Sequence, residues 1–207
     1  MESHSQAESV YRAKGPGGNA FVGRQPEMDE LQSTLEDALS GQGRLVMLVG
    51  EPGIGKTRTA QELAARAEQQ GAHVLWGWSY EEAGAPPYWP WIQPLRSYIQ
   101  QLDPDQLRSQ MGVGAADIAE VISEVRGKLP GLKPPPALEP EQARFRLFDS
   151  ITTFLKGAAQ SQPLMLVLDD LHWADKPPLL LLQFLARQLT ESHLLVVGCY
   201  RDLELSP

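Results

Sequence analysis

The chain has 207 residues, of which 42% are hydrophobic and 21% are charged. This length suits one α/β domain with a sizeable core, and this composition excludes a disordered or fibrous protein. The formal net charge of −8 gives no general attraction to nucleic acid or to an anionic membrane, so we expect neither as a direct partner. Cys199 is the only cysteine, which excludes an internal disulfide and favours a reducing compartment.

The N-terminal residues are polar and glycine-rich. They predict a flexible arm over residues 1–19, followed by one folded core over residues 20–207. The arm lacks the apolar stretch of a signal peptide, and no uninterrupted apolar run approaches the roughly 20 residues that span a bilayer. We therefore expect a cytoplasmic protein that does not enter the membrane.

Four short apolar runs are separated by helical patterns. A helix is predicted over residues 26–40, and further helices over 56–70, 141–156 and 179–189, the last apolar nearly all round and expected to be buried. The apolar runs cover residues 45–49, 74–78, 164–168 and 194–199, and none alternates with polar residues. Continuous apolar strands that alternate with helices predict an α/β fold, in which a parallel sheet lies between two layers of helices.

The long segment between the second and third apolar runs contains two proline-rich stretches. Residues 129–140 are predicted to form a loop. Residues 86–91 combine prolines with aromatic side chains and resemble a stacking platform for bases. Because no basic residues interleave them, we favour a rigid loop that packs onto the domain.

The strongest motif lies between the first apolar run and the following helix. It reads G-x-x-x-x-G-K-T, the pattern of the phosphate-binding P-loop, and consists of Gly50, Glu51, Pro52, Gly53, Ile54, Gly55, Lys56 and Thr57. Glycines allow the backbone N–H groups to point toward phosphate oxygens, and the N-terminus of the helix adds a partial positive charge. Lys56 is expected to reach the β and γ phosphates, and the Thr57 hydroxyl to bind Mg²⁺.

Paired carboxylates follow the third apolar run. Phosphoryl transfer requires one carboxylate near the metal and, for hydrolysis, a group that aligns water. Asp169 suits the first role and Asp170 the second. Asp175 precedes a long apolar helix, and we expect it to be an N-cap rather than a site residue.

Arg201 follows the fourth apolar run directly. The carboxyl ends of parallel strands form the ligand crevice, so its guanidinium is expected to bind the γ-phosphate. His172 and Trp173 are equally consistent with contacting the site and with packing. The buried-strand context of Cys199 predicts a small hydrophobic residue rather than a reactive thiol, and no His/Cys spacing indicates zinc.

These residues resemble the STAND class of AAA-like P-loop ATPases, as found in large LuxR-type transcriptional regulators and cyclase-linked signalling proteins. The resemblance rests on the P-loop and on three further runs: Phe21-Val22-Gly23-Arg24, the segment from Leu168 to Asp175, and Cys199-Tyr200-Arg201-Asp202. It implies that Val22 and Arg24 lie near the nucleoside. The expected nucleotide-binding residues are then Val22, Arg24, Gly50, Glu51, Pro52, Gly53, Ile54, Gly55, Lys56, Thr57 and Arg58, with ATP and Mg²⁺ as ligands.

The resemblance also implies a regulatory function. In that class ATP binding switches attached signalling or transcription-regulating domains between a closed and a self-associating state, and slow hydrolysis resets the switch. It further implies a P-loop ATPase core truncated on its C-terminal side, one strand short, with residues 45–49 at the edge of the sheet. The absence of an N-K-x-D sequence disfavours GTP.

Two other functions remain open on these residues. One is a nucleotide-dependent scaffold without hydrolysis. The other is a DNA-acting ATPase of the origin-recognition or helicase-loader type, which shares the same motifs but needs a basic surface. The net charge of −8 counts against the second.

Overall fold

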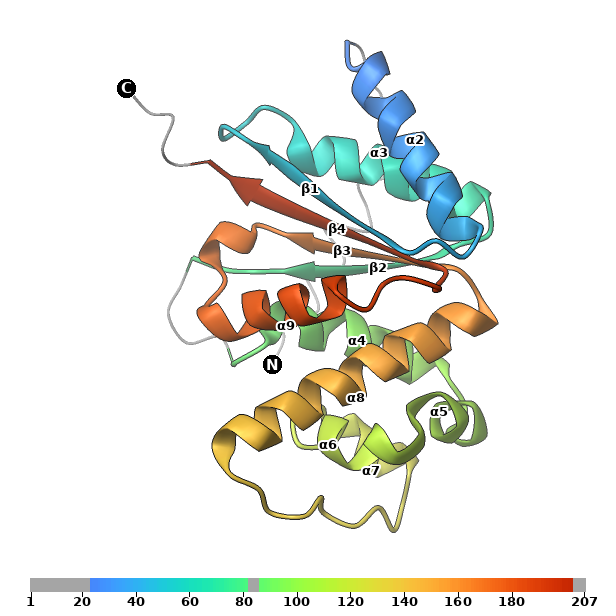
Figure 1. Cartoon of the computed structure of the whole chain (residues 1–207), viewed down its shortest axis with the longest axis vertical. Coiled ribbons are helices and arrows are strands. Elements are labelled where there is room, and N and C mark those ends of the chain that lie inside the picture. The colour runs from blue at the N-terminus through green and yellow to red at the C-terminus, as the bar shows by residue number, and fades with distance from the viewer. Residues whose placement is uncertain (1–22, 82–85, 203–207) are drawn as a thin grey trace, which may run out of the picture.

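Four strands form one parallel sheet in the computed structural model, which describes residues 23–81 and 86–202. The strands are β1 (Arg44–Gly50), β2 (His73–Trp78), β3 (Leu164–Asp169) and β4 (Leu194–Arg201). Their order is β1-β4-β3-β2, and every neighbouring pair is parallel (Figure 1). The predicted parallel sheet is confirmed, and the order places β3 and β4 in its centre, where continuous apolar runs are buried on both faces.

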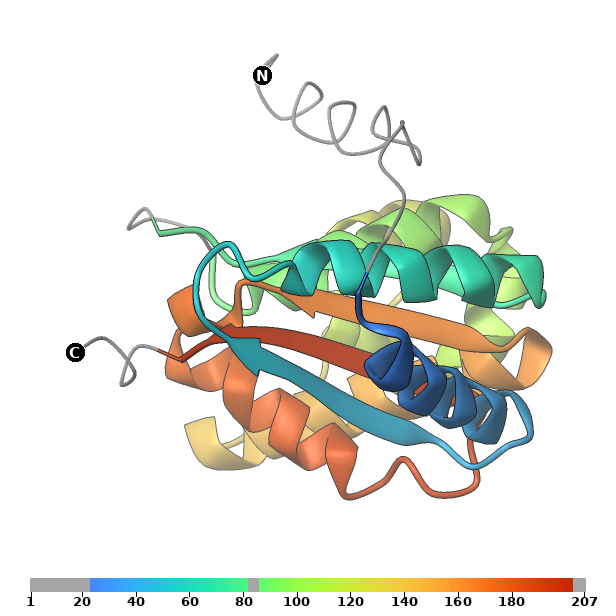
Figure 2. The same ribbon diagram turned by 90° about the horizontal axis from the view of Figure 1, so that it is seen from above.

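Helices cover both faces of this sheet. On one face lie α2 (Gln25–Leu39) and α3 (Lys56–Gln69), and on the other α4 (Trp89–Gln101), α8 (Pro140–Ser161) and α9 (Lys176–Ala186) (Figures 1 and 2). Alternate residues of the central strands enter two separate cores: Val167 and Val197 pack with α2 and α3, whereas Leu166 and Val196 pack with the opposite layer. The structure therefore has the predicted three layers.

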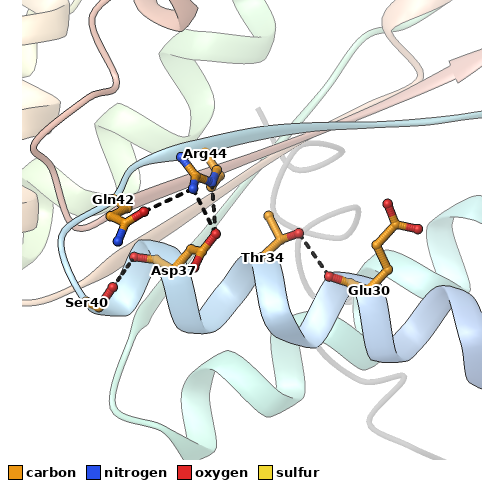
Figure 3. Close-up of polar contacts among 6 residues, drawn as sticks. All are labelled: Glu30, Thr34, Asp37, Ser40, Gln42 and Arg44. Atoms are coloured by element: carbon orange, nitrogen blue, oxygen red, sulfur yellow. Dashed lines mark hydrogen bonds and ion pairs between the residues drawn. The ribbon is translucent and has the colours of Figure 1, made fainter.

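The end of α2 is tied to the start of β1 by a small polar cluster (Figure 3). The Arg44 guanidinium donates two hydrogen bonds to Asp37 Oδ2, at 3.1 and 2.9 Å, and one to Gln42 Oε1 at 3.1 Å. The Ser40 hydroxyl donates to the carbonyl of Asp37 at 2.7 Å. Exposed pairs of this kind add little stability individually, but together they fix the connection from which β1 runs toward the P-loop.

The insert that was expected between the second and third strands contains helices that the sequence did not predict. After α4 come α5 (Pro104–Met111), the 3₁₀ turn η1 (Gly112–Gly114), α6 (Ala115–Ile118) and α7 (Glu124–Lys128). The expectation of a rigid loop over residues 86–91 was wrong in conformation, because α4 begins at Trp89 with Pro90 in its first turn, where proline is tolerated. It was right in packing: Trp91 is fully buried and donates from Nε1 to the Pro178 carbonyl at 3.1 Å.

Strand β1 is an edge of the sheet. Within the described residues it pairs only with β4, and the side chains of Met47 and Val49 are 40% and 54% exposed. The predicted edge position is confirmed, while a missing strand stays a prediction. Helix α9 is less buried than expected: Leu179 is exposed and lines an apolar groove with Leu45 of β1.

Residues 129–139 contain neither helix nor strand, as predicted, and Pro140 begins α8. The predicted arm over residues 1–19 lies outside the described residues. Across residues 23–81 and 86–202, no helix has both the length and the apolar character needed to cross a membrane.

Candidate phosphate-binding site

The P-loop connects β1 to α3. Gly53 and Gly55 have φ angles of +78° and +98°, which residues other than glycine rarely adopt. Gly55 is the N-cap of α3, so the N–H groups of the first helical turn have no intrahelical partner and face the loop. Gly50 is in register with Arg201, so the loop lies at the carboxyl end of the sheet. This is the backbone arrangement that binds an anion.

Lys56 is folded back into the loop that precedes it. Its ammonium donates hydrogen bonds to the carbonyls of Gly50 at 2.8 Å and Glu51 at 2.9 Å, and its side chain is largely buried. A buried ammonium requires such partners or a counter-charge. Carbonyl oxygens carry only partial charge, and phosphate oxygens satisfy the ammonium better. The residues of the loop therefore fit a polyphosphate.

Asp169 lies at the end of β3, 3% exposed. Burial raises the pKa of its carboxyl group, and the charge of Asp170 raises it further. Hydrogen bonds from Thr57, from the backbone N–H of Asp170 and from the Cys199 thiol lower the pKa and offset part of the shift. Thr57 and Asp169, the two predicted metal ligands, are thus in direct contact.

Asp170 has a different environment from its neighbour. Its backbone is left-handed, with φ 55° and ψ 39°, a conformation uncommon outside glycine and frequent at functional sites. Its side chain is 36% exposed, and its Oδ1 lies 3.6 Å from Arg201 Nη2. The structure therefore separates the two acids: one is buried against Thr57, and the other is accessible to water and paired with the predicted γ-phosphate ligand.

His172 and Trp173 pack beside Asp170, in the 3₁₀ turn η2 (Leu171–Trp173). The His172 ring lies 4.9 Å from the Trp173 ring and 6.2 Å from Tyr200. Burial lowers the pKa of His172, and the positive charge of Arg201 lowers it further. Asp175 occupies the N-cap position of α9, as predicted, although its side chain makes no capping hydrogen bond.

Arg24 joins the N-terminal part of the chain to the P-loop. Its guanidinium donates to the carbonyl of Ile54, 30 residues away in sequence. Arg58 lies half-buried in the first turn of α3. Val22, which was also expected near the nucleoside, lies outside the described residues.

Two neighbours of the site were not assigned to it from the sequence. Cys199 was expected to be a buried hydrophobic residue; it is buried, and burial raises the pKa of its thiol, but it also donates a hydrogen bond to Asp169. His172 was left undecided. Only the register of β4 against β3, which pairs Leu168 with Gly198, the residues directly before Asp169 and Cys199, reveals the first contact.

The donor set for a metal is small. Among the described residues no group of three or more His, Cys, Asp and Glu side chains is arranged to hold a metal ion. Thr57 and Asp169 offer two oxygens, as is usual where Mg²⁺ takes its other ligands from water and substrate phosphates. These residues fit a magnesium ion that arrives with a nucleotide.

Fold and site together define the class of protein. A parallel sheet in which a strand, a G-x-x-x-x-G-K-T loop and a helix follow one another, with a carboxylate at the end of β3 in contact with the loop threonine, is a P-loop NTPase. The comparison with known families is more specific. A family model described as "AAA ATPase domain" matches residues 20–197, and the chain belongs to that family.

Individual relatives are distant. The chain is 22% identical over 207 residues to "Uncharacterized protein R02095" of Rhizobium meliloti (strain 1021), covering 96% of this chain and 20% of that protein. Among solved structures, it is similar to Caenorhabditis elegans PCH-2 (13% identity, TM-score 0.43, 88% of this chain and 38% of that one). It is also similar to a structure of Drosophila ORC bound to DNA (15% identity, TM-score 0.40, 90% and 40%). The chain thus spans a fifth of the length of the curated relative.

Proposed function

We propose that this domain binds ATP–Mg²⁺ at the P-loop, hydrolyses it slowly, and uses its nucleotide state to control attached regulatory domains. The observation that carries the proposal is the convergence of three pairs at the carboxyl end of the sheet: Lys56 with the loop carbonyls, Thr57 with Asp169, and Asp170 with Arg201. Each pair holds a residue type that phosphoryl transfer requires.

Each residue has a role that follows from its position. The N–H groups of the loop and Lys56 hold the phosphates, and Arg24 and Arg58 flank the nucleotide. Thr57 and Asp169 would hold Mg²⁺, which would supply positive charge to the phosphate oxygens. Asp170 is accessible and aligns the attacking water. The water oxygen bonds to the γ-phosphorus, the β–γ bridging oxygen leaves with ADP and its electron pair, and the water proton passes through Asp170 to the phosphate product. Arg201 leaves Asp170 for the γ-phosphate.

A regulatory use of this chemistry is supported by two further features. The segments from Phe21 to Arg24 and from Leu168 to Asp175 resemble the motifs of the STAND class. The edge of β1 that no described strand pairs with, together with the apolar groove between Leu45 and Leu179, offers a surface for an attached domain or for self-association.

Single-turnover hydrolysis of labelled ATP tests the proposal. Asp170→Asn should bind ATP–Mg²⁺ normally but hydrolyse it at least about 100-fold more slowly, because an amide cannot take the water proton. Asp169→Asn should weaken binding that depends on Mg²⁺. Asp175→Asn is the matched control, since the same change at the N-cap of α9 removes no proposed function and should leave hydrolysis unchanged.

The results distinguish the alternatives. Normal hydrolysis by Asp170→Asn, or equal loss of binding in both site variants, would contradict the assigned roles. Binding without turnover in the wild type would favour a nucleotide-dependent scaffold. A salt-dependent DNA titration tests the nucleic-acid alternative, and we expect no binding because the chain is acidic.

A further inference from the structure

His172 has a buried polar side chain that the proposed roles do not use. Its side chain is 1% exposed. Neither ring nitrogen has a hydrogen-bond partner within the part of the chain that the structure describes. Buried polar groups are almost always hydrogen-bonded, because an unpaired one carries a free-energy penalty. An orphaned imidazole beside a catalytic carboxylate therefore requires an explanation.

One acceptor lies just beyond hydrogen-bonding distance. His172 Nδ1 is 3.8 Å from Asp170 Oδ1, the same oxygen that lies 3.6 Å from Arg201 Nη2. A movement of roughly 1 Å brings the nitrogen into hydrogen-bonding range. Rotation of the Asp170 side chain achieves it without moving the backbone, and contacts of catalytic groups are often long before substrate binds.

The backbone holds both residues in place for this exchange. The Trp173 N–H donates to the Asp170 carbonyl at 3.0 Å and closes the turn that contains His172. The imidazole is held between the rings of Trp173 and Tyr200, and Tyr200 adjoins Arg201 on β4. The Asp170 carboxylate thus lies between the imidazole of His172 and the guanidinium of Arg201.

We propose that His172 is a positioning residue that takes Asp170 over from Arg201 when nucleotide binds. Once the γ-phosphate draws the Arg201 guanidinium away, Oδ1 of Asp170 loses its nearest cation. Nδ1 of His172 then donates to Oδ1 and fixes the carboxylate, which leaves Oδ2 directed at the attacking water. Both the neutral ring protonated at Nδ1 and the imidazolium can donate this bond. The inference rests on the hydrolysis proposed above and adds a residue that neither the motif nor the metal site requires.

Three substitutions separate this role from simple packing. In His172→Asn the amide nitrogen lies close to the former Nδ1, whereas in His172→Gln it lies closer to the former Nε2. His172→Phe fills the same space without a donor. Loss of an orienting partner typically lowers activity about 10- to 100-fold, so the single-turnover rate should fall by that factor in the Phe and Gln variants and be largely retained in the Asn variant.

Binding and coupling measurements complete the experiment. ADP affinity should remain close to the wild-type value in all three variants, and the unfolding temperature should not fall, because the unpaired imidazole that is removed carries a free-energy penalty. In an Asp170→Asn background, His172→Phe should cause no further loss of rate, because both changes remove one function. A role in packing predicts the opposite: a lower unfolding temperature, an additive loss of rate, and no difference between Asn and Gln.

The outcomes also distinguish this inference from the proposed function. If the wild type hydrolyses ATP and His172→Phe does so equally well, or if Gln and Asn behave alike, the role of His172 is overturned and the ATPase stands. If the wild type binds ATP–Mg²⁺ without hydrolysing it, both hydrolysis and this inference fall, while the binding site stands.

Discussion

The two glycines at the ends of α3 allow the P-loop to be tested against a matched control. Gly55, before the helix, has φ +98°, and Gly71, after it, has φ +86°; a Cβ at either position would meet no atom within 4 Å. Substitution by alanine therefore costs only backbone strain at both sites, about 1 to 2 kcal/mol each. For a chain of this size, that corresponds to a fall in Tm of about 2 to 8 °C.

The two variants should differ in how much ATP–Mg²⁺ stabilises them. At 100 times its dissociation constant, ATP–Mg²⁺ should stabilise the wild type by about 2.7 kcal/mol, or roughly 5 to 10 °C. Gly71→Ala should keep this increment in full. Gly55→Ala should lose most of it, because alanine shifts the loop backbone and directs a methyl group toward the phosphates.

Thermal unfolding with and without ATP–Mg²⁺ measures both effects, and titration calorimetry confirms the change in affinity. The reasoning would be refuted if Gly55→Ala retained the full nucleotide increment, or if Gly71→Ala lost it. A much larger fall in Tm for one apo variant would show that the strain at the two glycines is not equivalent.

Three further predictions address the loop, the metal carboxylate and the sheet edge. Arg24→Ala should weaken ATP binding about tenfold, because the Ile54 carbonyl loses its guanidinium donor and a charge-assisted hydrogen bond contributes about that factor. An unchanged affinity in titration calorimetry would contradict this prediction. Burial raises the pKa of Asp169 above its ordinary value of 3.8, so its charge destabilises the fold above the raised pKa, and this penalty disappears as pH falls toward 3.8. In metal-free urea unfolding, Asp169→Asn should then have a larger free energy of unfolding than the wild type at pH 7, and this difference should shrink as pH falls. A difference that stays constant with pH would contradict a raised pKa for Asp169. Val49→Lys should reduce self-association at the β1 edge, as measured by sedimentation velocity. Phe145→Lys, at an exposed apolar site on α8, is the control and should leave self-association unchanged. Equal effects of the two substitutions would exclude the β1 edge as the contact.

The strands and the P-loop were predictable because their signals are local. Continuous apolar runs and the G-x-x-x-x-G-K-T spacing depend only on neighbouring residues, and the structure moves the predicted strand ends by no more than two residues. The edge position of β1 was predicted from the resemblance to a family of P-loop ATPases, and the strand order confirms it.

The helices between β2 and α8 and the details of the site could not be predicted from local sequence signals. Proline at positions 90 and 94 obscured α4, which accommodates Pro90 in its first turn and contains Pro94 within the helix. Trp91 is stabilised by a hydrogen bond to a residue 87 positions away. Asp170 has a left-handed backbone, and the ring nitrogens of His172 have no hydrogen-bond partner among the described residues; no local sequence pattern predicted either feature.

The central claim is that Lys56 lies in a nucleotide phosphate site, and ligand-induced stabilisation of Lys56→Ala tests it most directly. Lys133→Ala, an exposed lysine in the loop before α8, serves as the control for the loss of one positive charge. With ATP–Mg²⁺ at 100 times the wild-type dissociation constant, the wild type and Lys133→Ala should each gain about 2.7 kcal/mol, and Lys56→Ala should gain almost nothing. An equal gain in all three proteins would contradict the assignment of the phosphate loop.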